Sequence, residues 1–183
     1  MAKSELPIRG QFHVEHLRTG KVIGTHDFPN GITVEGKNRL LSNMFNNGNA
    51  VSTWYLGLID ANSATVNDTN DNYNSAKSGG AWNEYNGYNV GGNSTIRGTW
   101  GANTASNKTI TNQNPVVFDI NTGSNQVIYG IMVCGGGTTA NAQVKGNSSN
   151  DPNACLWSTA NFTAGNVTVQ NGDQLKVTYT VST

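Results

Sequence analysis

Charged residues are scarce in this sequence: Lys, Arg, Asp and Glu make up 12% of the chain, against ~25% in typical soluble domains. The 11 Lys and Arg residues balance 11 Asp and Glu residues, so the formal net charge is zero. Binding to a phosphate backbone needs clustered cations, and here the cations are scattered. We therefore expect no nucleic-acid partner. A neutral surface instead favours association between proteins.

Long apolar runs are also missing, and no stretch approaches the ~20 residues that a membrane-spanning helix needs. We expect no membrane partner. The first ten residues, MAKSELPIRG, lack the apolar core of a signal peptide, which predicts that the protein is made in the cytoplasm of its cell. The only cysteines are Cys134 and Cys155. They either form one disulfide or remain as buried free thiols, and we favour free thiols.

The chain divides by pattern into three parts. Residues 1–10 show no periodicity and predict an extended N-terminal arm. Residues 11–28 predict a β-hairpin, because two strand-like runs flank Thr19-Gly20. Residues 29–183 predict a sandwich domain. Within it, one short helix is expected over about 34–46, capped by Thr33.

Short strand-like runs dominate the rest of the chain. TWYLGLID (53–60) is apolar on both faces, which indicates a central strand covered on both sides. Ile59 and Tyr55 could meet Leu41 and Phe45 of the predicted helix. Eight to ten short strands with one helix are typical of a mainly β fold, an antiparallel β-sandwich or jelly roll.

The hairpin contains all three histidines of the chain. With a two-residue loop, His13 lies opposite His26 with Glu15 on the same face, a set that could bind a transition metal. A one-residue slip in register would disperse the set, so the default interpretation is a hairpin without metal. Three aspartates near the polar stretch 61–80 lack the spacing of a calcium loop: Asp60, Asp68 and Asp71. We expect no metal and no cofactor.

Four aromatic residues lie among amides or near them in sequence: Trp82, Tyr85, Tyr88 and Trp100. Two interpretations apply. The rings could form a platform on which sugars stack, as in a carbohydrate-binding module. Alternatively, they fill the open ends of a sandwich core, where Tyr and Trp keep their polar tips accessible to water.

No catalytic set is recognisable. Glu84 and Asp119 are the only carboxylates inside or next to aromatic, strand-like segments, and Cys134 precedes three glycines without any histidine marked as its base. A nucleophile elbow is absent from the sequence. We therefore expect a protein that is not an enzyme.

A series of short segments stands in order along residues 29–181: PNG (29–31), GKNRLL (36–41), MF (44–45), TWYLGLID (53–60), DT (68–69), GAWNEY (80–85), RGTW (97–100) and GDQL (172–175). Together they resemble a family of small structural proteins from the virions of tailed bacteriophages. The resemblance implies a jelly-roll-like virion protein on the capsid exterior. It would act as a decoration, or cement, protein that binds the major capsid protein and bridges neighbouring subunits.

The resemblance also allows a tail, neck or fibre component. A homo-oligomer would suit the local symmetry of a shell, with a trimer preferred to a dimer. The contacts with the capsid or with other copies are expected in the N-terminal region, which carries apolar side chains that an arm or hairpin would expose. The expected contact residues are Ile8, Arg9, Phe12, Val14, Val22 and Phe28.

Overall fold

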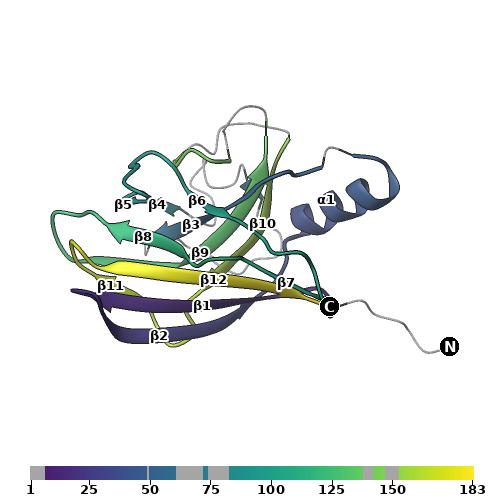
Figure 1. Cartoon of the computed structure of the whole chain (residues 1–183). Helices are drawn as coiled ribbons and strands as arrows, with labels where there is room; N and C mark the ends of the chain where they lie inside the picture. Colours follow the sequence, from purple (N-terminus) through teal and green to yellow (C-terminus); the bar gives the residue numbers. More distant parts are fainter. Residues whose placement is uncertain (1–6, 49, 61–71, 74–82, 138–141, 147–152) are drawn as a thin grey trace.

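The computed structural model describes residues 7–48, 50–60, 72–73, 83–137, 142–146 and 153–183. In these parts of the chain, two antiparallel sheets pack as a sandwich with one helix beside them (Figure 1). The predicted mainly β fold and β-sandwich are confirmed. The described residues form twelve strands where eight to ten were expected, and several of the strands are only two or three residues long.

The first sheet is built around the N-terminal hairpin and the last strand. Its strand order is β2 (Lys21–Asn30), β1 (Arg9–Arg18), β12 (Gln174–Ser182), β8 (Val116–Ile120) and β5 (Tyr88–Asn89), with β7 (Thr109–Thr111) also paired to β12. Strand β1 pairs with β2 on one side and with β12 on the other over most of its length. The predicted hairpin is therefore an integral part of this sheet.

The second sheet has the order β10 (Ala154–Asn161), β9 (Gln126–Gly136), β3 (Trp54–Asp60) and β4 (Glu84–Tyr85), with β11 (Val167–Val169) paired to β9 and β6 (Gly98–Trp100) paired to β3. Strand β3 is central, as predicted. Its Leu56 and Leu58 join the main core between the sheets. Its Ile59 joins a second cluster with Tyr73 and Met132 on the other face.

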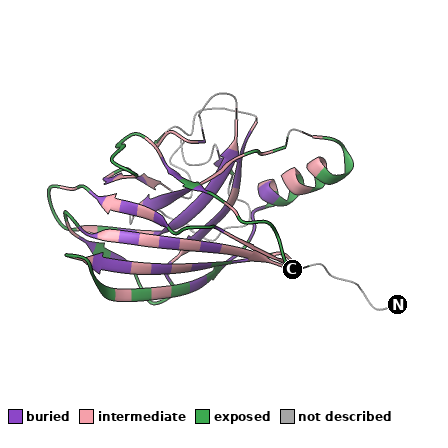
Figure 2. Ribbon diagram, in the orientation of Figure 1, coloured by how far each residue is buried: buried purple, intermediate pink, exposed green. Residues whose placement is uncertain are grey.

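Burial follows the alternation of strand side chains. Figure 2 shows buried and less buried bands alternating along β1 and β12, whose inner faces line the main core. Phe12, Val14, Leu175, Val177 and Tyr179 point inward from these two strands and are all buried. A strand with one face against a core and one face toward solvent requires this period of two.

The helix α1 spans Val34–Phe45, close to the predicted range. Thr33 caps it as predicted, because its Oγ1 accepts a hydrogen bond of 2.9 Å from the Gly36 backbone N–H. Gly36 faces strand β10 so closely that a Cβ would lie 3.0 Å from the Trp157 carbonyl oxygen. The first turn of the helix is thus held against the sandwich by close backbone contact.

The predicted contact between this helix and β3 is wrong. Leu41 and Phe45 are exposed to 54% and 78%, and Tyr73 packs beside Ile59 instead. The orientation is set at the first turn, where one carboxylate oxygen of Glu35 accepts hydrogen bonds from the backbone N–H groups of Tyr73 and Leu156. With Glu35 and Gly36 directed at the sandwich, Leu41, Met44 and Phe45 farther along the helix point outward.

Candidate functional site

The hairpin residues expected at an interface divide between core and surface. Phe12, Val14 and Phe28 are fully buried, and the rings of Phe12 and Phe28 stack with centroids 5.2 Å apart. Their assignment as surface contacts is corrected, because the alternation of β1 and β2 directs these three side chains into the core. A partner could reach them only by unfolding the sheet.

The other hairpin residues remain accessible. Arg9 is exposed, Ile8 is partly buried, and Val22 and its neighbour Ile23 are each 51% exposed at the hairpin tip. Among the described residues, β2 pairs with β1 alone, so it is an edge strand. Contact through Ile8, Arg9 and Val22 therefore stays a prediction.

The histidines do not form the metal set that a simple register suggests. A bulge between His16 and Leu17 shifts the pairing, so that His13 lies opposite Asp27 and His26 lies opposite Val14. Among the described residues, no three His, Cys, Asp or Glu side chains lie close enough to share a metal ion. Of the three aspartates considered for calcium, Asp60 belongs to β3; Asp68 and Asp71 lie outside the described residues.

A buried carboxylate ties the first strand to the turn before the last strand. Asp173 accepts hydrogen bonds from Nε and Nη2 of Arg18, both at 2.8 Å, and its Oδ2 lies 2.8 Å from Nε2 of His16. The Gln170 backbone N–H donates to the same carboxylate. These hydrogen bonds, above all from Arg18, hold the pKa of Asp173 well below its usual range. The aspartate of the GDQL segment thus has a structural role.

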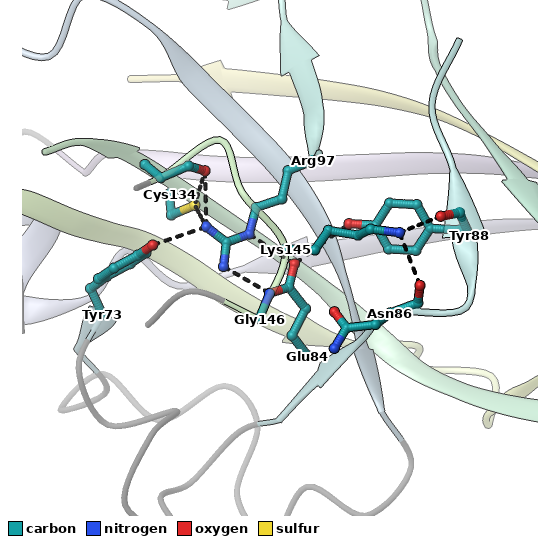
Figure 3. A network of polar contacts seen from close by, with 9 residues as sticks. Tyr73, Glu84, Asn86, Tyr88, Arg97, Cys134, Lys145 and Gly146 are labelled. Carbon is teal, nitrogen blue, oxygen red and sulfur yellow. Dashed lines mark hydrogen bonds and ion pairs between the residues drawn. The ribbon is translucent and has the colours of Figure 1, made fainter. Parts of the chain in front are cut away.

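A second buried network lies on the outer side of the second sheet (Figure 3). Arg97 is completely buried, and its Nε and Nη2 donate to the two carboxylate oxygens of Glu84 at 2.8 and 2.7 Å. Its Nη1 donates to the Tyr73 hydroxyl at 3.0 Å and to the Ala142 carbonyl at 2.9 Å. The Gly146 backbone N–H donates to Oε2 of Glu84, the oxygen that also accepts from Nη2 of Arg97. Around this bidentate ion pair, the network joins segments as far apart in sequence as Tyr73 and Gly146.

The network does not provide an activated nucleophile. Cys134 lies 3.5 Å from Nη1 of Arg97, but burial raises the pKa of its thiol to about 11, so at neutral pH the thiol is protonated and inert. Cys134 and Cys155 are both buried free thiols, as favoured from the sequence. Glu84, considered as a catalytic carboxylate, is committed to the ion pair with Arg97.

The aromatic residues considered for sugar binding belong to the core where the structure describes them. Tyr85, Tyr88 and Trp100 are buried members of the main hydrophobic cluster. Lys145 covers one face of Tyr88, with its Nζ 4.1 Å from the ring centroid. The interpretation of these three residues as an exposed sugar-binding platform is corrected, because all three rings are buried in the core. Trp82 lies outside the described residues.

Among the described residues, the most exposed large apolar side chains lie on α1. Val34, Leu41, Met44 and Phe45 are exposed to 45%, 54%, 65% and 78%, and we refer to them as the outer helix face. Val34, Leu41 and Phe45 are spaced by seven and four residues, which places them along one side of the helix. Large apolar side chains exposed together in this way mark sites of contact with another molecule. The outer helix face is therefore the candidate functional site.

Two further findings bear on the class of protein. No helix in the described parts of the chain is long and apolar enough to span a membrane. In comparisons with known proteins, no family model, no curated protein and no solved structure matches this chain.

Proposed function

We propose that the chain is a structural protein of a tailed-phage particle: a decoration (cement) protein that binds the outside of the head and bridges neighbouring capsid subunits. The ordered segments from PNG to GDQL suggest this class. The observation that carries the proposal is the outer helix face, which the isolated chain leaves exposed. In this proposal the face binds the major capsid protein.

The size of the outer helix face fits a useful contact. Fully burying a large apolar side chain stabilises by about 1.5–3 kcal/mol, and the four residues of the face are between 45% and 78% exposed. Their burial would contribute roughly 5 kcal/mol before the cost of association. After that cost, one contact alone gives little net affinity, and several such contacts made by one homo-oligomer on the shell would add through avidity.

Bridging two subunits needs a second contact, and the hairpin tip supplies one. Val22 and Ile23 are each 51% exposed in edge strand β2. In this proposal the tip touches the neighbouring subunit or a neighbouring copy of the protein, in line with a homo-oligomer. The zero net charge of the chain allows many copies to lie close together without strong mutual repulsion.

Binding of purified protein to phage heads that lack it tests the proposal. Substituting both Leu41 and Phe45 by Ser removes most of the outer helix face, and should weaken binding about 50-fold, since each 1.4 kcal/mol corresponds to a factor of ten. The matched control is Val127→Ser, which changes an exposed apolar residue of β9 and should alter binding less than twofold.

The two kinds of failure are distinguishable. No binding of the unaltered protein to heads would contradict the function itself. Normal binding of the Leu41→Ser, Phe45→Ser variant would contradict the role of the outer helix face. Because both side chains are more than half exposed, urea unfolding should show little change in stability for this variant.

A further inference from the structure

Four asparagines in the chain are followed directly by glycine: Asn30, Asn47, Asn86 and Asn171. Such a pair is chemically labile, because the backbone nitrogen of the glycine can attack the side-chain amide of the asparagine, and glycine has no Cβ that hinders the approach. Two conditions favour this reaction. The asparagine side chain must be free to turn toward its own backbone, and the glycine N–H must not be held in a hydrogen bond.

Three of the four pairs fail one of these conditions. Asn30 is buried, so its side chain cannot turn. The N–H of Gly48 donates to the Ser42 carbonyl oxygen at 3.0 Å. The N–H of Gly172 donates to the Ile120 carbonyl oxygen at 3.0 Å. Each of these two hydrogen bonds must break before the glycine nitrogen can lose its proton and react.

The fourth pair, Asn86-Gly87, meets both conditions. It lies between β4 and β5, and Asn86 is exposed. Among the described residues, neither the Asn86 side-chain amide nor the Gly87 N–H has a hydrogen-bond partner. Packing also requires glycine at this position, because a Cβ on Gly87 would lie 2.3 Å from the Tyr85 hydroxyl. The fold therefore keeps a labile pair at the surface.

Lys145 acts on the same peptide group. Its Nζ donates to the Asn86 carbonyl oxygen at 2.9 Å and also to the Tyr88 carbonyl oxygen (Figure 3). The Asn86 carbonyl belongs to the peptide bond whose nitrogen is that of Gly87. When this nitrogen loses its proton, resonance spreads the negative charge onto the carbonyl oxygen, which faces the ammonium group. The contact therefore stabilises the anion that attacks the side chain.

We propose that Asn86-Gly87 is a site of spontaneous deamidation assisted by Lys145. Solvent base removes the Gly87 amide proton, and the nitrogen forms a bond to Cγ of Asn86. The bond between Cγ and the side-chain nitrogen breaks, and that nitrogen takes a proton from water and leaves as ammonia. Water then opens the five-membered imide, which gives aspartate or isoaspartate.

The product carries one additional negative charge beside Lys145, in a chain whose formal net charge is otherwise zero. Each copy of the protein thus changes its charge with age. The proposal does not depend on the virion function, because it rests only on the chain's own residues.

Peptide mapping by mass spectrometry compares the four pairs within one sample. The full chain is incubated in mildly alkaline buffer, once folded and once unfolded in urea, where all four asparagines should deamidate at similar rates. In the folded chain, Asn86 should react at least about fivefold faster than each of the other three, which must first lose a hydrogen bond or leave the core. Asn86 reacting no faster than the other three would overturn the proposal.

Two substitutions test the part of Lys145. Lys145→Met removes the cation and should slow deamidation of Asn86 about fivefold or more, because a charge-assisted hydrogen bond is lost. Lys145→Arg keeps a positive charge and should restore most of the rate. A merely structural lysine would give the opposite result, since its loss would loosen the segment and speed the reaction. An unchanged or faster reaction in Lys145→Met would therefore contradict its role.

Asn86→Gln is the control for the site. Glutamine would have to form a six-membered ring, which closes much more slowly, and the exposed position should tolerate the change. In ion-exchange chromatography of the folded protein, the unaltered chain should develop a more negative form with time, and the variant should not. An equal amount of this form in the variant would overturn the proposal.

Discussion

Replacing Glu84 by Gln would leave a buried cation without its counter-charge. Arg97 has no exposed surface and donates two hydrogen bonds of 2.8 and 2.7 Å to the carboxylate. Gln keeps the size of the side chain but not its charge. Removing one partner of a buried ion pair costs about 3–5 kcal/mol. Because Arg97 keeps its bonds to Tyr73 and Ala142, we expect a loss near the lower end, about 3 kcal/mol.

Urea denaturation of a double-mutant cycle measures this cost. At about 2–4 °C for each kcal/mol, the Glu84→Gln variant should also melt roughly 6–12 °C below the unaltered protein. The Arg97→Met variant should lose a similar amount, because Glu84 is then the unpaired buried charge. The double variant should be more stable than the sum of the single losses predicts, by about 2 kcal/mol or more. A loss below about 1 kcal/mol for Glu84→Gln alone would refute the reasoning.

Three further predictions follow from buried groups. Arg18 holds the pKa of Asp173 well below its usual range, so the stability that this carboxylate contributes is complete above about pH 4 and falls as the pH drops further. In urea unfolding, the free energy of unfolding of the Asp173→Asn variant should therefore fall less steeply below about pH 4 than that of the unaltered protein. An equally steep fall in both proteins would contradict this prediction. Burial raises the pKa values of Cys134 and Cys155 to about 11 and about 12. Both thiols should therefore react only slowly with a thiol reagent at about pH 8 until urea unfolds the chain. Rapid labelling of the folded protein would show that the thiols are not buried. A Cβ on Gly130 would lie 1.9 Å from a backbone carbonyl oxygen of β10, so Gly130→Ala should cost about 3 kcal/mol, and an unchanged melting temperature would be inconsistent with this packing.

Local patterns predicted the elements that short-range physics determines. The run TWYLGLID indicated a central strand, and β3 is one because both of its faces are buried. Thr33 predicted the start of the helix because capping depends only on the next three residues. Thr19 and Gly20 predicted the hairpin turn, and both have the positive φ angles that such a turn requires.

Other features depend on contacts that sequence spacing does not encode. The apolar side of the helix predicted a buried face, but Gly36 and the carboxylate of Glu35 direct the opposite side toward the sandwich. The bulge after His16 changed the register and separated His13 from His26.

The ion pair of Glu84 with Arg97 was also missed. In the sequence, Glu84 was only an isolated acidic candidate and Arg97 one of several scattered cations. Only the pairing of β3 with both β4 and β6 brings these two segments together. The sequence did contain one signal for a buried pair. Glu84 and Arg97 each lie close to an aromatic residue of a short strand-like segment, and they carry opposite charges.

The number of copies in purified particles tests the central claim most directly. Quantitative mass spectrometry should find this protein at hundreds of copies per particle, measured against the major capsid protein, if it decorates the head. A dozen copies or fewer would place it in the tail or neck and contradict the cement function. Absence from the particle would contradict a virion protein altogether.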